Sequence, residues 1–344
     1  MKKILRATLA GVSLLLGAGA ALAEGELQIY NWGNYTSPEL VKKFEEKYKV
    51  KVSITDYDSN DTALAKVRAG GTGFDIAIPS GNFLPVWISE GLILEARPDQ
   101  MENFKNLRED FVNPPFDPGR HYSVPWLWGT YGVAVNTKHY SGDIDTWKVI
   151  FDPPDELKGK INIVPEMGDA IYAAMTYTGG TYCSGDKEML KKARDVLLAA
   201  KPHWMSMEYA TQEPMVKGDM LATSDWNGSV LRQRLVNPDI RYGFPREGTF
   251  IWQDTVVILK EAKNVENAKL FINFIMDPEN AAMNSAFARY ANAINGSEPF
   301  MPEDMKGAPE LGLPDFMKGK TIFSVACPPD VVELYTRIWT DVMK

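Results

Sequence analysis

Near the start of the chain, the spacing of apolar residues switches between the period of a β-strand and that of an α-helix. Residues 27–30 alternate as in a strand, and apolar side chains from Leu40 to Tyr48 then recur on one face of a helix. Ser37 can cap this helix, and Pro38 suits its first turn. The pattern continues with a strand at 50–57, a short helix at 61–69 and a strand at 75–79. Strands alternating with helices predict a largely parallel sheet with right-handed crossovers.

A long apolar stretch at 124–135 separates this first set from a second one. Its length suits a segment that crosses from one lobe to another. The second set has strands at 160–164, 221–226 and 250–259, and helices at 169–178, 187–199, 265–276, 279–289 and 331–343. Residues 296–320 are rich in Gly, Pro and acids, which predicts a surface excursion. Two α/β units with more than one crossing segment predict a hinged, two-lobed protein.

The first 23 residues have the pattern of an export signal. Lys2, Lys3 and Arg6 precede an apolar core at 9–20, and small residues predict cleavage after Ala23. The core is short and interrupted by Ala and Gly, and no other run approaches the ~18 apolar residues of a membrane span. We therefore expect export without membrane insertion.

Size and charge narrow the class of protein. About 320 residues would follow the signal, more than one compact core usually holds, so two lobes are expected. The formal net charge of −8 becomes −11 without the signal, because the signal carries three basic residues and no acids. An acidic chain disfavours nucleic acid and anionic lipid as partners. It favours a cationic ligand only weakly, because solubilising surface charge explains it equally well.

Few residues favour covalent or metal chemistry. Cys183 and Cys327 are consistent with a disulfide in an oxidising compartment or with two isolated buried thiols. His121, His139 and His203 are scattered, so we expect no metal and no cofactor.

Motifs of hydrolases, P-loop enzymes and zinc proteases are missing, and the glycines at 70–73 fit a turn rather than a dinucleotide fingerprint. Glu166 and Asp169 could in principle serve a secreted glycosidase, but they could equally bind an amine. We expect that the protein is not an enzyme.

Aromatic and acidic residues gather at the ends of the predicted strands. The set comprises Trp32 and Tyr35, Ser80, Glu166 and Asp169, Trp226, and Trp252 with Asp254. Aromatic faces combined with carboxylates suit a cationic ligand with an apolar body.

The chain resembles the periplasmic polyamine-binding proteins, which are the spermidine- and putrescine-binding components of ABC importers. The resemblance covers about residues 26–295 and rests on Tyr30-Asn31-Trp32, Tyr57-Asp58-Ser59-Asn60, Gly73-Phe74-Asp75, Pro79-Ser80, Pro125-Trp126-Leu127-Trp128-Gly129, Trp226-Asn227-Gly228-Ser229 and Lys263-Asn264. It implies the type II two-lobed periplasmic-binding-protein fold, in which each lobe is a mostly parallel sheet flanked by helices and the lobes are joined by crossing hinge segments.

The resemblance also implies a set of ligand-binding residues. They are Trp32, Tyr35, Ser80, Glu166, Asp169, Trp226, Trp252, Asp254 and Tyr290. In this interpretation the carboxylates accept charge-assisted hydrogen bonds from ammonium groups, and the aromatic faces cover the methylenes.

Some positions depart from the family pattern. Gly33-Asn34 stands where putrescine binders carry Ser-Asp, Asn82 replaces a Tyr or Ser, and Ser229 stands where putrescine binders place an acid. The last two departures resemble the spermidine type more closely. The family's remaining ligand contact, expected in the last forty residues, has no recognisable counterpart.

The sequence therefore predicts a monomeric periplasmic receptor that delivers spermidine or putrescine to an ABC permease. The expected N-terminal lobe comprises residues 24–134 and 255–300, and the C-terminal lobe comprises residues 135–254 and 301–344. The alternatives are a receptor of the same fold for another amine-containing or neutral solute, a sensor with the same pocket, and a secreted hydrolase.

Overall fold

The structure is a computed structural model and describes residues 25–344. The predicted export signal and its cleavage site after Ala23 lie outside the described residues. The described strands are β1 (Gly25–Trp32), β2 (Val50–Tyr57), β3 (Ile76–Ala77), β4 (Ser123–Asn136), β5 (Ile161–Asn162), β6 (Trp204–Ser206), β7 (Ala222–Trp226), β8 (Ile240–Gly243), β9 (Thr249–Ile258) and β10 (Thr321–Phe323).

The α-helices of the described residues lie between and around these strands. They are α1 (Pro38–Tyr48), α2 (Asn60–Arg68), α3 (Leu84–Ser89), α4 (Lys148–Phe151), α5 (Met167–Tyr177), α6 (Lys187–Ala200), α7 (Gln212–Lys217), α8 (Asn227–Val236), α9 (Val265–Ile275), α10 (Pro278–Ala288) and α11 (Pro329–Met343). The first helix starts as its sequence predicts: Ser37 caps it by accepting a hydrogen bond from the Leu40 backbone N–H, and Pro38 occupies its first turn.

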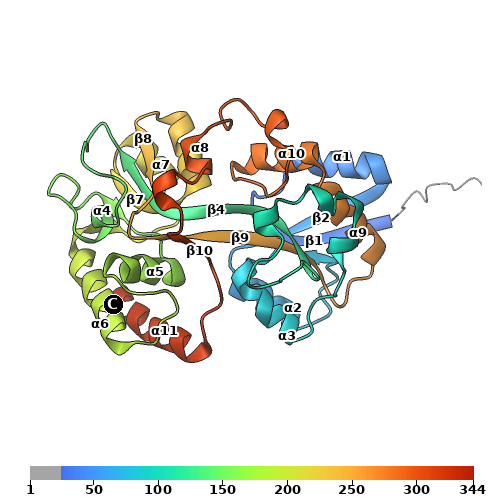
Figure 1. The fold of residues 1–344 in the computed structure, drawn as a ribbon, viewed down its shortest axis with the longest axis horizontal. Helices are drawn as coiled ribbons and strands as arrows, with labels where there is room; N and C mark the ends of the chain where they lie inside the picture. The colour runs from blue at the N-terminus through green and yellow to red at the C-terminus, as the bar shows by residue number, and fades with distance from the viewer. Residues whose placement is uncertain (1–24) are drawn as a thin grey trace, which may run out of the picture.

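The strands form one hydrogen-bonded sheet, and a group of helices packs around each end of it. This arrangement gives the α/β, two-lobed architecture (Figure 1). The order is β2-β1-β3-β9-β4-β7-β5-β6, with β8 beside β4 and β10 beside β9. Strand β1 pairs in parallel with β2 and β3, and β5 pairs in parallel with β6 and β7. Each lobe thus has the parallel ladder that its alternating strand–helix pattern predicts.

Strands β4 and β9 run through both lobes and pair antiparallel to each other (Figure 1). Every residue of β4 is buried, as expected of a continuously apolar strand. The register of this pair shifts between Pro125 and Trp128, which places an irregularity at the junction of the lobes. Strand β10 lies parallel to the start of β9 and forms a third segment there.

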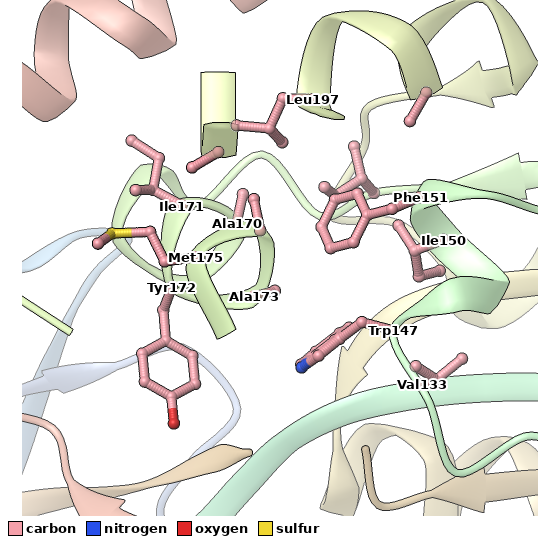
Figure 2. Close-up of a cluster of buried hydrophobic side chains, with 14 of the residues drawn as sticks. Val133, Trp147, Ile150, Phe151, Ala170, Ile171, Tyr172, Ala173, Met175 and Leu197 are labelled. Atoms are coloured by element: carbon pink, nitrogen blue, oxygen red, sulfur yellow. The ribbon is translucent and has the colours of Figure 1, made fainter. Parts of the chain in front are cut away.

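Separate hydrophobic cores lie on the two sides of this junction. Figure 2 shows part of the core between β4, α4, α5 and α6, where Trp147, Phe151 and Ile171 are buried. The core on the other side includes Phe44 of α1 and Phe271 of α9. Both crossing strands contribute to both cores.

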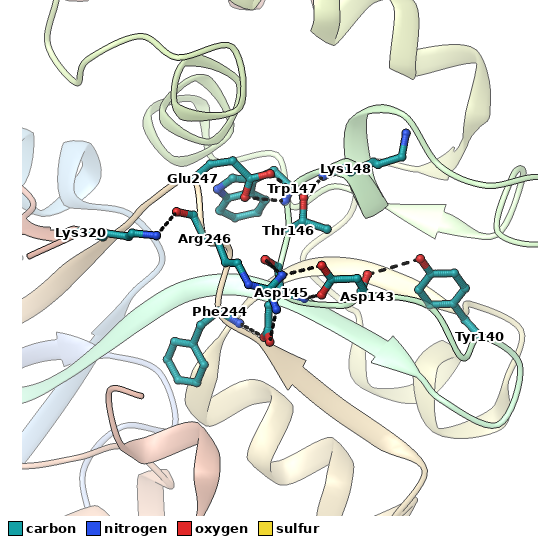
Figure 3. A network of polar contacts seen from close by, with 10 residues as sticks. All are labelled: Tyr140, Asp143, Asp145, Thr146, Trp147, Lys148, Phe244, Arg246, Glu247 and Lys320. Carbon is teal, nitrogen blue, oxygen red and sulfur yellow. Dashed lines mark hydrogen bonds and ion pairs between the residues drawn. The ribbon is translucent and has the colours of Figure 1, made fainter. Parts of the chain in front are cut away.

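A polar network pins the loop before α4 to the start of β9 (Figure 3). Asp145 accepts a hydrogen bond from the Phe244 backbone N–H, and Arg246 pairs with Asp143. The Lys320 ammonium donates to the Arg246 carbonyl oxygen at 3.1 Å, so the residue before β10 is held against the segment between β8 and β9.

The segment at 296–320 is irregular, as its composition predicts, but it is not simply a surface excursion. Glu310 is 1% exposed and forms an ion pair with Arg234 of α8 at 2.5 Å. Its carbonyl oxygen also accepts a hydrogen bond from Asn227. A composition of Gly, Pro and acids gives no signal for such a buried anchor.

Cys183 and Cys327 form a disulfide with Cα atoms 5.0 Å apart, which decides between the two alternatives that the sequence leaves open. The bridge ties the loop after α5 to the segment between β10 and α11. Within residues 25–344, no helix combines the length and the apolarity that a membrane span requires.

Breaking the disulfide should lower the free energy of unfolding, because the bridge restricts the unfolded chain across a separation of 144 residues. The chain-entropy model gives an upper value of about 5 kcal/mol for such a loop. Urea denaturation with and without reductant measures the effect. The double variant Cys183→Ser/Cys327→Ser is the control, and its midpoint should not respond to reductant. Equal midpoints for oxidised and reduced wild-type protein would contradict the prediction.

Candidate functional site

The end of β1 delivers Trp32 to an aromatic cluster in the N-terminal lobe. The Trp32 indole N–H donates to the carbonyl oxygen of Ile78 at 3.0 Å, and the Tyr57 hydroxyl donates to the same oxygen. The two rings lie 4.6 Å apart between centroids. The carbonyl after β3 therefore orients two aromatic faces at once.

A buried carboxylate lies next to this cluster. Asp254 of β9 is 7% exposed and accepts a hydrogen bond from the Ser80 hydroxyl at 2.6 Å. Asn60 at the start of α2 holds Ser80 by donating to its hydroxyl and accepting from its backbone N–H, both at 3.0 Å. Tyr35 is buried nearby, and its hydroxyl lies beside the Asp254 carboxylate.

A second acidic group lies at the N-terminus of α5 in the other lobe. Glu166 occupies the N-cap position of this helix without a capping hydrogen bond from its side chain, and Asp169 lies in the first turn. The Trp226 indole N–H donates to Asp169 at 3.1 Å, and the Tyr209 hydroxyl donates to Glu166 at 3.2 Å. Each acid is therefore held by one aromatic side chain.

Trp226 and Trp252 connect the two groups, because both pack against the cores of both lobes. A Cβ atom at Gly129 of β4 would lie 2.7 Å from the Trp252 ring and 2.1 Å from Asn227, so a side chain there would displace them. The Tyr290 ring lies edge-on to Trp252, with ring centroids 4.9 Å apart. Its centroid lies 6.1 Å from that of the Tyr35 ring.

Tyr290 also touches the first turn of α8. A Cβ at Gly228 would lie 2.3 Å from its ring, so only glycine allows this approach. The Arg232 guanidinium lies 5.4 Å from the centroid of the same ring and donates to the Ala288 carbonyl oxygen. The structure thus brings all nine predicted side chains into two connected groups, one in each lobe.

Burial changes the acidity of these carboxyls. Desolvation raises the pKa of Asp254 from 3.8 to about 6, and the Ser80 hydrogen bond opposes that rise. Asp254 in turn contributes to the raised pKa of Tyr35, of which burial is the main cause.

The acids on α5 are perturbed in the same direction. Desolvation and then the charge of Glu166 raise the pKa of Asp169 well above its usual value. The pKa of Glu166 is also raised, first by desolvation and then by Asp61 of α2 in the opposite lobe. Glu166 is exposed, and Asp169 is half-buried. In the described part of the chain, no basic side chain lowers the pKa of Glu166, Asp169 or Asp254.

Sequence reasoning missed several neighbours of this site. Tyr57 was assigned to a strand and to the resemblance, Asn60 to the resemblance alone, and Asp61 only to a helix. Tyr209 lies in a loop without periodicity. Tyr182 donates to the Val325 carbonyl oxygen at 3.2 Å, and Asp169 contributes to its raised pKa. The segment between β10 and α11 therefore lies near the acids of α5, which no sequence pattern indicated.

Two hollows, of about 10 and 140 Å³, lie in the N-terminal lobe and include none of the nine residues. Among residues 25–344, no group of three or more His, Cys, Asp or Glu residues could hold a metal ion.

Two α/β lobes joined by long shared strands, with aromatic and acidic side chains from both lobes meeting at the junction, define a solute-binding protein. Residues 39–312 match the family described as bacterial extracellular solute-binding protein, and the chain belongs to this family.

Individual relatives carry more specific names. The chain is 30% identical to the spermidine/putrescine-binding periplasmic protein of Escherichia coli over 284 residues, which cover 81% of each chain. It is 27% identical to the putrescine-binding periplasmic protein SpuD of Pseudomonas aeruginosa, covering 99% of this chain and 97% of that one. Among solved structures, the substrate-binding protein PotD of a spermidine/putrescine ABC transporter from Streptococcus pneumoniae superposes with a TM-score of 0.83 at 27% identity, covering 93% of this chain and 99% of that one.

Replacing Asp254 by Asn should stabilise the ligand-free protein at neutral pH. The folded pKa of Asp254 lies above that of an unfolded Asp, so stability is lost as the pH rises from 3.8 to about 6 and the full cost remains above that pH. The gain of the variant should be close to zero at pH 4 and up to about 3 kcal/mol at pH 7.5. Chemical denaturation at both pH values measures it.

The exposed carboxylate Asp56 on β2 provides the control, and Asp56→Asn should show no such gain. An Asp254→Asn protein that is less stable than wild type at pH 7.5 would contradict the prediction.

Proposed function

We propose that the protein is the periplasmic substrate-binding component of a polyamine ABC importer. It binds spermidine or putrescine between its lobes and delivers the ligand to a membrane permease. The names of the relatives and the acidic, aromatic composition of the site support this proposal.

One observation carries the proposal: three carboxylates meet aromatic faces without a basic partner. Asp254 is buried, Asp169 is half-buried, and Glu166 is exposed beside Asp169. Burying a carboxylate without a compensating charge is costly. An ammonium group would remove this cost by forming a charge-assisted hydrogen bond.

The arrangement assigns a role to each side chain. Asp254, with the Ser80 and Tyr35 hydroxyls beside it, would accept one ammonium in the N-terminal lobe. Asp169 and Glu166 would accept a second, or a second and a third, in the other lobe. The remaining faces, Trp32, Trp226, Trp252 and Tyr290, would cover the methylenes between them.

The same proposal covers the lobes and the partners. We assign residues 24–134 and 255–300 to one lobe and residues 135–254 and 301–344 to the other, with closure by hinge motion around β4 and β9. Asp254 is the boundary residue of this assignment, and its side chain lies against the N-terminal lobe, where it accepts the hydrogen bond from Ser80. The protein would act as a monomer without catalysis, and the membrane permease would recognise its closed form.

A thermal-shift panel on protein refolded to remove carried-over ligand tests the ligand. It compares putrescine, cadaverine, spermidine and spermine with arginine, γ-aminobutyrate and sugars. Polyamines should raise the melting temperature, because ligand at a hundredfold excess over Kd stabilises the folded state by about 2.7 kcal/mol. Asp254→Asn should remove most of this shift. A shift with another solute and none with polyamines would retain the receptor fold and exclude the ligand.

Affinity for a polyamine should fall as the pH drops below about 6. Ammonium groups bind the ionised carboxylates, and burial raises the pKa of all three acids. Each proton that must be released on binding weakens affinity by up to about tenfold per pH unit. Calorimetric titration of spermidine between pH 8 and pH 5 measures this, with circular dichroism confirming the fold at each pH. An affinity independent of pH would contradict the assignment of these carboxylates to the ammonium groups.

A further inference from the structure

Tyr209 is an exposed aromatic residue that the predicted ligand set does not contain. Its side chain is 57% exposed, although its ring and hydroxyl both contact site residues. The ring lies nearly parallel to that of Trp226, with an interplanar angle of 10° and centroids 6.4 Å apart. Its hydroxyl proton is shared between Glu166 at 3.2 Å, the shorter contact, and the Pro165 carbonyl oxygen at 3.4 Å.

Each of the two stacked rings belongs to a side chain that donates a hydrogen bond to a different acid of α5. Trp226 donates its indole N–H to Asp169, and Tyr209 donates its hydroxyl to Glu166. Tyr209 therefore positions Glu166 by a hydrogen bond, as Trp226 positions Asp169. Because Glu166 can accept more than one hydrogen bond, this contact fixes the carboxylate and leaves it able to accept an ammonium.

The loop that carries Tyr209 is anchored on both sides. Before it, Glu208 exchanges backbone hydrogen bonds with the Asn162 side chain, at 2.8 and 3.0 Å. After it, the Thr211 hydroxyl donates to the buried Asp225 at 2.7 Å. The ring is thus held by a positioned backbone.

Glu166 marks the place where the two lobes face each other. The charge of Asp61, on α2 of the opposite lobe, acts on Glu166. An ammonium bound to Glu166 would therefore lie next to Tyr209, whose hydroxyl donates to the same carboxylate, and on the side of α5 that feels the charge of Asp61.

We propose that Tyr209 is a specificity-determining residue, which fixes Glu166 and extends the Trp226 aromatic surface so that the site favours a triamine over a diamine. This inference rests on the proposed function. A diamine needs two of the acids, whereas the added aminopropyl arm of a triamine needs Glu166 and an apolar surface leading to it. Tyr209 supplies both requirements from one side chain.

Two substitutions separate the two contributions. Tyr209→Phe removes the hydroxyl and keeps the ring, and Tyr209→Ala removes both. Tyr140→Phe is the matched control, because Tyr140 lies in the same lobe and donates one hydroxyl hydrogen bond, to the Asp143 carbonyl oxygen, away from the site (Figure 3). Calorimetry with spermidine and with putrescine at pH 7.5 gives a Kd for each protein.

Tyr209→Phe should weaken spermidine binding by about threefold to tenfold, the value of one hydrogen bond. Tyr209→Ala should weaken it by about tenfold to a hundredfold, since aromatic coverage is lost as well. Putrescine binding should change by less than about threefold in both variants, and Tyr140→Phe should match wild type.

A pH profile distinguishes positioning from a purely structural role. The titratable groups facing Glu166 are Asp169 on α5, Asp61 on α2, Tyr131 on β4, and Tyr182 and Tyr209 in loops. Only Tyr209 lowers the pKa of Glu166 by a hydrogen bond. Spermidine affinity of Tyr209→Phe should therefore begin to fall at a higher pH than that of wild type.

The outcomes separate this inference from the proposed function. Wild-type protein that binds neither amine overturns both. Wild-type protein that binds spermidine overturns the inference alone if the Tyr209 variants keep its Kd and pH profile, or if spermidine and putrescine lose affinity equally. Because Tyr209 is exposed, unchanged melting temperatures without ligand should accompany the expected result.

Discussion

The antiparallel pairing of β4 and β9 is the constraint on which the rest of the structure depends. These two strands belong to both lobes, and their residues enter both hydrophobic cores. They also carry or support the site directly: Trp252 and Asp254 lie in β9, and Gly129 of β4 leaves the space that Trp252 fills. The register shift between Pro125 and Trp128 falls beside these residues. The place where the lobes join is therefore the place where the ligand groups meet.

The site is costly to the fold, because it buries the Asp254 carboxylate and partly buries that of Asp169 without a cation. Asp254 and Asp169 are held by neutral donors from Ser80 and Trp226. Neutral donors reduce the cost of burial but do not remove the charge, so the raised pKa values remain. These carboxylates are therefore incomplete without a positively charged group. The same carboxylates that favour binding lower the stability of the ligand-free protein.

The sequence predicted the parts of this structure that depend on local pattern. The helix after Ser37, the buried strand at 124–135 and the acids of α5 all follow from periodicity, capping or strand ends. Strand β10 could not be predicted, because its three residues adopt a strand only by pairing with β9. Tyr209 and Asp61 could not be connected with the site for a similar reason, since their relation to Glu166 arises only when distant segments pack together.

The discontinuous lobes also determine the order in which the chain can fold. Phe44 of α1 packs against Phe271 of α9, with centroids 5.1 Å apart although most of the chain separates them. The other core needs Tyr335 of α11 to close over α5. Neither lobe can complete its core from a contiguous piece of chain. A chain that emerges with its N-terminus first must therefore wait for the residues up to Ile294 before the first core is complete, and for α11 before the second core is complete, which makes folding a late event of the whole molecule.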